Sequence, residues 1–173
     1  MRTKEIKQKI KSVGNIKKIT KTMEMVSVSK MRRAVDKALS SRSYSHYALE
    51  LLVNLSRNKD VSHPLMVRGK SEKELIILIT SNKGLCGGYH TNLFKALFFY
   101  TKTKELQGKE LKAVTIGKYA EKICKKLNIA TFASFTTFSE YSNLEQIKEL
   151  SGLVIKEFLE GDYKSVKIYI LNF

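Results

Sequence analysis

The chain has 173 residues and a net charge of +16, from 32 Lys and Arg against 16 Asp and Glu. Its apolar fraction of 43% is normal for a globular protein, which excludes a wholly disordered chain. Its two cysteines are too few for a disulfide framework, and the sequence has no run of apolar residues long enough for a membrane span.

The positive charge is concentrated in the first quarter of the sequence. Residues 1–42 hold 13 Lys or Arg and three acidic residues, a net charge of +10. A local excess of this kind indicates an acidic partner, which is a nucleic acid, an anionic membrane surface or an acidic protein surface.

Residues 1–57 are predicted to form a long basic coiled-coil helix, because apolar residues recur at every third or fourth position. The predicted seam consists of Ile6, Ile10, Val13, Ile16, Ile19, Met23 and Val26. Serines 40, 41, 43 and 45 mark a soft spot where the helix could bend or break. Such a helix is roughly 80 Å long, whereas a domain made from the remaining residues is only about 30–35 Å across. We therefore expect other polypeptide to cover much of the seam.

Residues 58–73 are predicted to be a polar linker, and residues 74–173 an α/β domain. The strand-like runs ELIILI, KAVTIG, IATFASF and SVKIYILNF alternate with helical patterns, which predicts a Rossmann-like domain with a mostly parallel sheet. Asn143 is the predicted N-cap of the last helix. The last strand has central-strand character, so we expect the domain to be truncated at its C-terminus and the chain to be part of a longer protein.

The stretch SNKGLCGGYHTN follows a predicted buried strand and opens a helix, a place where phosphate can bind. Gly84, Gly87 and Gly88 do not fit the dinucleotide fingerprint, and the one Gly-Lys-Ser precedes the strand. We interpret the stretch as a structural turn that needs positive φ or close packing. Cys86 near His90 has no evident third partner, so we predict no catalytic, cofactor or metal site.

The basic helix is open to three interpretations at this point. It could be a solvated face, a nucleic-acid-binding coiled coil, or a coiled-coil shaft inside a protein collar. The lack of any aromatic residue before Tyr44 weighs against nucleic-acid binding.

Two blocks of the sequence resemble the gamma subunit of F-type ATP synthases. The first is TKEIKQKIKSVGNIKKITKTMEMVSVSKMRRA at residues 3–34, and the second is ITSNKGLCGGYHTNL at residues 79–93. Their order and spacing also match the family, while residues 100–165 are generic.

The resemblance implies a rotor subunit, or central stalk, without catalytic residues or a cofactor. In the family, the N-terminal helix pairs antiparallel with a C-terminal helix inside a ring of alpha and beta subunits. The α/β domain lies against the epsilon subunit and the membrane c-ring. Proton flow turns the shaft, and ATP is made on the beta subunits. The resemblance further implies the cytoplasmic face of a bacterial plasma membrane, membrane contact only through the complex, and no nucleic acid.

By matching position, the resemblance places Met23 at an acidic lever segment of a beta subunit. It also implies that neighbouring cations attract that segment; these are Lys17, Lys18, Lys21, Lys30, Arg32 and Arg33. The family's C-terminal helix has no counterpart in these residues, so we expect an incomplete shaft. Cys86 and Cys124 do not match the regulatory cysteine pair of the chloroplast branch, so we expect no thiol gating.

Overall fold

The structure is a computed structural model that describes residues 3–58, 60–67, 69, 71–106, 108–138, 142, 144–161 and 163–171. The chain divides into two compact units, residues 1–61 and residues 62–173. Each unit is described separately below.

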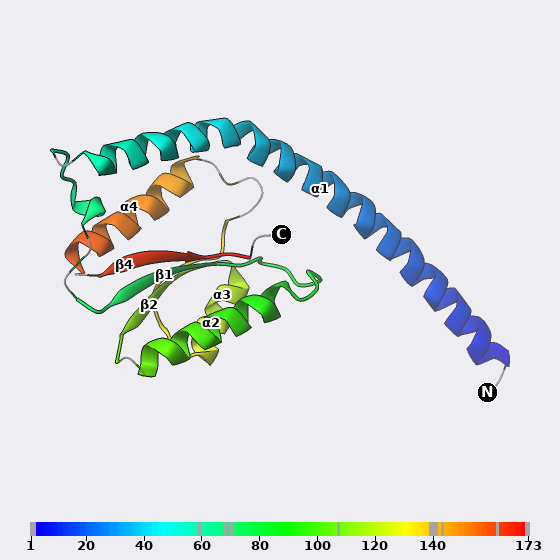
Figure 1. Ribbon diagram of the computed structural model, residues 1–173. Coiled ribbons are helices and arrows are strands. Elements are labelled where there is room, and N and C mark those ends of the chain that lie inside the picture. The colour runs from blue at the N-terminus through cyan, green and yellow to red at the C-terminus, as the bar shows by residue number, and fades with distance from the viewer. Residues whose placement is uncertain are drawn as a thin grey trace. The chain divides into compact units, whose positions relative to one another are not determined.

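The first unit is a single helix, α1 (Thr3–Arg57), of 55 residues. It curves along its length without a break (Figure 1). The predicted soft spot is helical, and its serine hydroxyls donate to carbonyls of the preceding turn: Ser40 to Lys37 O, Ser41 to Ala38 O and Ser45 to Ser41 O. Such bonds occupy the polar side chains and favour bending over breakage.

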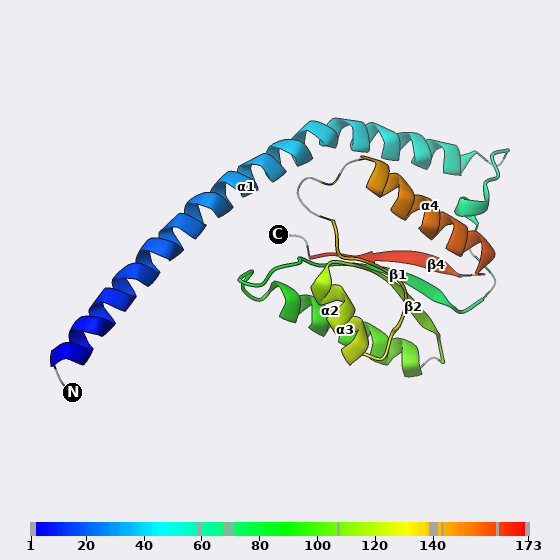
Figure 2. The ribbon, with the colours of Figure 1, turned by 180° about the vertical axis from the view of Figure 1, so that it is seen from behind.

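The second unit is a parallel α/β domain, as the sequence predicts. Its strands are β1 (Glu74–Ile79), β2 (Leu111–Ile116), β3 (Ala130–Phe135) and β4 (Ser165–Tyr169), arranged in the order β3-β2-β1-β4 with parallel pairing throughout. The helices are α2 (Tyr89–Leu106), α3 (Lys118–Lys126) and α4 (Leu144–Glu160). The helices α2 and α3 cover one face of the sheet and α4 covers the other (Figure 1; Figure 2).

Apolar side chains fill the space on both faces of the sheet. On the α2 and α3 face, Ile76 and Leu78 pack with Leu93, Leu97 and Ile123. On the α4 face, Leu75 and Val114 pack with Val154 and Tyr163. Because β1 is buried on both faces, its sequence from Leu75 to Ile79 is a continuous apolar run, which is why it could be recognised as a strand.

Three local features differ from the sequence predictions or lie beyond them. Among the described strands, β4 pairs with β1, because the crossover from β3 passes β2 and β1. The predicted linker contains a 3-10 helix, η1 (Pro64–Met66). His63 caps the start of this helix, because its Nδ1 accepts a hydrogen bond from Leu65 N at 3.2 Å. The predicted N-cap Asn143 lies outside the described residues.

Candidate functional site

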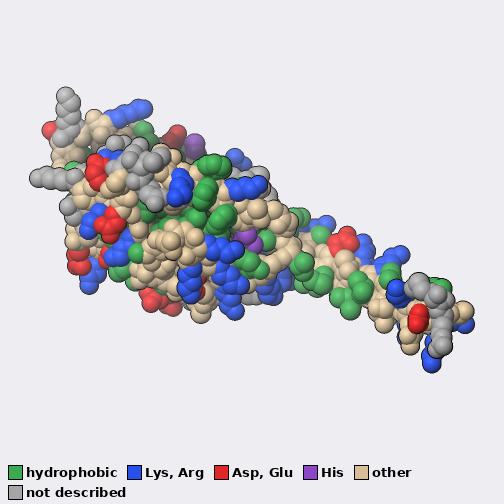
Figure 3. Space-filling model, turned by 90° about the horizontal axis from the view of Figure 1, so that it is seen from below, with side chains coloured by type: hydrophobic (Ala, Val, Ile, Leu, Met, Phe, Trp, Pro, Cys, Tyr) green, Lys and Arg blue, Asp and Glu red, His purple; other side chains and the backbone are tan. Residues whose placement is uncertain are grey.

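The helix α1 exposes the whole of its predicted seam. The seven seam side chains are between 44% and 67% exposed, and α1 contains no buried residue. Figure 3 shows apolar and cationic side chains together at the surface along the helix. A contiguous apolar surface of this kind marks a place where another polypeptide packs.

The seam winds around α1 and does not follow one straight line. Ile10 and Ile19 are nine positions apart, which is two and a half turns at about 3.6 residues per turn, so their side chains project from opposite sides. A single partner helix lying along one face would therefore leave part of the seam uncovered. Partners on more than one side would cover it.

Between residues 16 and 32, α1 has two opposed faces. Taking about 100° per residue, four of the seven apolar residues in this segment fall within an arc of about 80°: Ile16, Ile19, Met23 and Val26. Four of its five cations fall within an arc of about 100°: Lys17, Lys18, Lys21 and Arg32. We call these sets the apolar arc and the cationic arc. The separation is not complete, since Met25 and Val28 lie on the cationic side and Lys30 on the apolar side. The centres of the two arcs are roughly 170° apart, so the arcs face different surroundings.

A shallow groove of about 400 Å³ lies on the cationic side of α1. Met25 and Val28 form its apolar part, and Arg32, Arg33 and Glu24 its charged part. This combination suits an apolar side chain that lies beside a carboxylate. The sequence reasoning missed Glu24, Met25, Val28 and Ser29 in this place, although their spacing of three and four residues from one another and from Arg32 was a usable signal.

The structure does not bring all of the predicted partner-binding residues together. Met23 lies in the apolar arc, on the side opposite Lys17 and Lys21. By the same geometry, Lys30 belongs to the side of the apolar arc, and Arg33 lies between the two arcs. Lys21 Nζ forms an ion pair with Glu24 at 3.1 Å, and both side chains are largely exposed. Exposed pairs of this type contribute only about 0–1 kcal/mol each.

The Gly-rich turn after β1 contains residues with positive φ. Gly87 has φ +57° and Leu85 has φ +61°, while a Cβ on Gly84 would lie 3.1 Å from Tyr119 Oη. Positive φ is favourable for glycine and strained for leucine. The predicted structural role of Gly84 and Gly87 thus has a physical basis, whereas Gly88 makes only ordinary contacts.

Asn82 ties this turn to two other loops at the same edge of the sheet. Its Nδ2 donates to Thr136 O at 3.0 Å and to Phe138 O at 2.9 Å, and its Oδ1 accepts from Lys118 N at 3.0 Å. The ring of His90 stacks on Tyr119 with centroids 3.9 Å apart, and its Nε2 is 3.0 Å from Ser81 Oγ. Asn82, Ser81 and His90 Nε2 are therefore engaged in holding the turn, whereas His90 Nδ1 is buried without a hydrogen-bond partner among the described residues.

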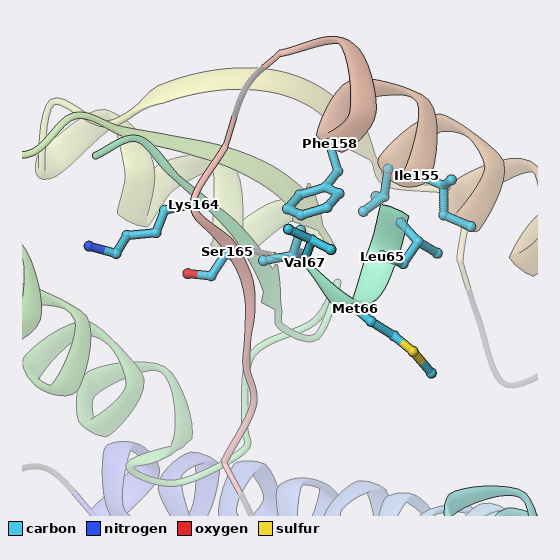
Figure 4. Close-up of a pocket in the computed structure, with 9 residues that line it drawn as sticks. Leu65, Met66, Val67, Ile155, Phe158, Lys164 and Ser165 are labelled. Atoms are coloured by element: carbon cyan, nitrogen blue, oxygen red, sulfur yellow. The ribbon is translucent and has the colours of Figure 1, made fainter. Parts of the chain in front are cut away.

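A second cavity, of about 410 Å³, lies in the α/β domain between η1, α4 and β4. Figure 4 shows that Leu65, Val67, Ile155 and Phe158 point toward one another, whereas Lys164 points away. Lys164 Nζ is bound to both carboxylate oxygens of Glu72, at 2.9 and 3.1 Å. The lining is mostly apolar, and its polar residues are Lys164, which is engaged by Glu72, and Ser165. A substrate pocket requires several convergent polar groups, which these two residues do not supply.

Neither cysteine is in a disulfide. Cys124 is buried against the sheet, and Cys86 is half-buried in the Gly-rich turn. Burial raises the pKa of the Cys124 thiol to about 11, which suppresses its reactive thiolate form at neutral pH. None of the described helices has the length and apolar content that crossing a bilayer requires.

Comparison with known proteins gives one consistent family. The family model described as ATP synthase matches residues 2–173. The chain is 36% identical over 172 residues to an ATP synthase gamma chain from Paraburkholderia phytofirmans, which covers 98% of this chain and 58% of the relative. It is 37% identical over 166 residues to the gamma chain of Geotalea daltonii, a match that covers 95% of this chain and 58% of the relative. It is 33% identical over 171 residues to the gamma chain of Trichlorobacter lovleyi, a match that covers 98% of this chain and 59% of the relative.

The chain therefore spans less than two thirds of the length of these relatives. The matched region includes both α1 and the α/β domain. These comparisons favour the rotor interpretation and give no support to the nucleic-acid alternative.

Proposed function

The chain belongs to the ATP synthase gamma chain family, and we propose that it forms the N-terminal part of the central rotor of an F-type ATP synthase. In this proposal, α1 lies inside a collar of alpha and beta subunits, and the α/β domain lies toward the epsilon subunit and the c-ring. Proton flow through the membrane ring turns the shaft. The asymmetric shaft then drives the catalytic sites of the beta subunits through successive states.

The observation that carries the proposal is the exposure of two opposed arcs on one helix. The apolar arc, with Ile19 and Met23 among its members, is suited to packing against another helix. The cationic arc, with Lys18 and Lys21, is suited to acidic segments of a surrounding collar. A shaft enclosed on several sides accounts for both arcs and for the winding of the seam. A helix packed on one side only would leave one arc and part of the seam without a partner.

We assign no catalytic role to this subunit. Its turn after β1 makes internal hydrogen bonds, and the cavity between η1, α4 and β4 is mostly apolar. The chemistry of ATP synthesis is assigned to the beta subunits. The subunit itself is placed at the cytoplasmic face of a bacterial plasma membrane, held there through the complex.

Charge reversal in the cationic arc tests this proposal. The double variant K18E/K21E is introduced into the purified ATP synthase complex, and proton pumping per ATP hydrolysed is measured in vesicles. The proposed contacts of these two lysines with acidic segments of the collar become repulsive. Because such exposed contacts contribute about 0–1 kcal/mol each, we expect coupling to fall about two- to tenfold. Subunit composition of the complex is measured in parallel and is expected to be unchanged.

The matched control is K95E/K156E, which changes the net charge by the same amount at exposed lysines of the α/β domain. We expect this control to couple normally. Normal coupling in K18E/K21E, or equal losses in both double variants, would rule out the assigned role of the cationic arc.

A further inference from the structure

The side chain of His90 connects the Gly-rich turn with two helices. His90 is the second residue of α2 and is half-buried. Its ring stacks on the ring of Tyr119 in α3, with the centroids 3.9 Å apart and the planes 6° from parallel. Its Nε2 lies 3.0 Å from the Oγ of Ser81, at the start of the turn. One imidazole ring therefore joins the turn to both α2 and α3.

The hydrogen bonds of Ser81 determine which nitrogen of His90 carries the proton. The hydroxyl of Ser81 donates to Lys83 O, which can only accept. Because a hydroxyl has a single hydrogen, Ser81 Oγ must accept from His90 Nε2. Lys83 O, which lies 3.5 Å from Nε2, is an acceptor as well. We therefore assign the neutral ring the Nε2–H form, in which it cannot act as a base toward Ser81.

The other ring nitrogen, Nδ1, lies where an added proton would have no partner. It is buried, and it makes no hydrogen bond to any part of the chain that the structure describes. Protonation of His90 would place an N–H group and a positive charge at this atom. A buried charge without a hydrogen-bond acceptor is costly, so the closed turn suits the neutral ring and not the imidazolium.

The turn and the start of α2 offer no negative charge to balance an imidazolium. Residues 80–88 contain Lys83 and Cys86 but no acid, and the first turn of α2 has none either. The ring of Tyr89 lies 5.3 Å from that of His90, and burial raises the pKa of its hydroxyl, which is therefore neutral. The next charged residue of α2 is a further cation, Lys95.

The charges of α3 near the stacked rings are also mainly positive. The ammonium group of Lys122 lies 5.1 Å from the centre of the Tyr119 ring, on which His90 stacks. Lys118 begins the helix. Glu121 is the single acid in the sequence of α3, and it pairs with Lys125 at 2.8 Å. The surroundings of His90 therefore disfavour a second positive charge.

We propose that His90 is a pH-sensitive lock on the Gly-rich turn, closed by the neutral imidazole and released by its protonation. On release, the ring leaves Tyr119 and the added proton is solvated by water. The hydrogen bond between His90 and Ser81 is lost, and Leu85 is no longer held at its φ of +61°. Neither apolar core cluster contains Ser81 or His90, so the sheet keeps its packing.

The direction of the pH effect follows from the proton that opening takes up. An imidazole in water is half protonated at about pH 6.5. In the proposal only the open turn takes up this proton, so opening becomes more favourable as the pH falls below that value and is independent of pH well above it. Between pH 7.5 and 5.5 the ratio of open to closed turn then rises about tenfold.

Hydrogen exchange of the full chain, measured by mass spectrometry at pH 7.5 and 5.5, tests the lock. Peptides that contain the turn and the start of α2 are compared with peptides of β2 in the same sample, because the intrinsic exchange of amides changes with pH in both. In the wild type we expect exchange of the turn relative to β2 to rise about tenfold at pH 5.5. In H90Q, whose amide can still donate to Ser81 but takes up no proton, we expect no rise.

The matched control is H46Q, which removes a histidine of α1 that is 67% exposed and should keep the wild-type rise. A measurement on the unchanged chain carries the test even if H90Q does not fold. Nitrogen NMR distinguishes the two neutral forms of each of the three histidines, and we expect the Nε2–H form of His90 at pH 7.5. The Nδ1–H form, equal relative exchange of the turn at both pH values, or an equal rise in the wild type and H90Q overturns the proposal.

Discussion

Gly117, between β2 and α3, is a position at which a single methyl group should damage the α/β domain. Its φ is +92°, and a Cβ built there would lie 2.3 Å from the carbonyl oxygen of Thr80. The nearby Thr80 Oγ1 donates to Ile116 O at 3.2 Å and accepts from Ala120 N at 2.8 Å. An alanine at this position must therefore displace the end of β1 from the start of α3.

The expected cost of G117A follows from these contacts. Holding a residue other than glycine in this backbone region costs about 1–3 kcal/mol. Loss or weakening of the two hydrogen bonds of Thr80 adds about 1–2 kcal/mol. The total destabilisation of about 2–5 kcal/mol is a large fraction of the roughly 5–15 kcal/mol that stabilises a typical domain.

Urea unfolding followed by near-ultraviolet circular dichroism measures this cost. The chain has eight tyrosines and no tryptophan, so its tyrosines report on tertiary packing. The matched control is G152A in α4, where a Cβ meets nothing within 4 Å. We expect this control to stabilise the domain by about 0.5–1 kcal/mol, because alanine is the better helix former. A G117A chain within about 0.5 kcal/mol of the wild type would refute the reasoning, since that is the range of a neutral surface change.

The remaining predictions concern ionisable groups of the α/β domain. Burial opposes ionisation of Glu74 and Glu157, but hydrogen bonds from lysines prevail and lower the pKa of both carboxyls below the ordinary 4.5. The stabilising effect of both carboxylates is present above that value and is lost as the pH falls through the lowered pKa values. The free energy of unfolding should therefore fall more steeply with acid in the wild type than in E74Q/E157Q. Parallel curves of this free energy against pH would contradict the prediction. A maleimide at pH 7.5 should label Cys86 in the native chain and Cys124 only after unfolding, because burial raises the pKa of Cys124 to about 11; equal labelling rates in the native chain would contradict it.

Local patterns in the sequence were sufficient to predict the elements of the fold. The helix α1 follows from the spacing of its apolar residues and the absence of proline from its sequence. The strand β1 follows from an apolar run of the kind that a strand covered on both faces requires. The place of β4 could not be predicted in this way. Its apolar sequence is typical of a central strand, but only the path of the crossover from β3 determines that it pairs with β1.

The candidate site could be predicted only in part. The cations of α1 and its apolar residues were identified, but Met23 was grouped with Lys21 because the two are close in sequence. Side chains two positions apart on a helix differ by about 200° in direction, so Met23 and Lys21 lie on opposite faces. The contacts of Glu74 with Tyr100, Lys104 and Lys167 were missed, because a glutamate at the start of a strand looks solvent-facing and these partners are 26 or more residues away.

The central claim is that other polypeptide encloses α1 between residues 16 and 33. Hydrogen exchange of this segment should be compared between the isolated chain and the assembled ATP synthase complex. In the isolated chain the segment is exposed, so we expect rapid exchange; in the complex we expect exchange to slow by at least about a hundredfold. Equal exchange rates in the two states would contradict the claim.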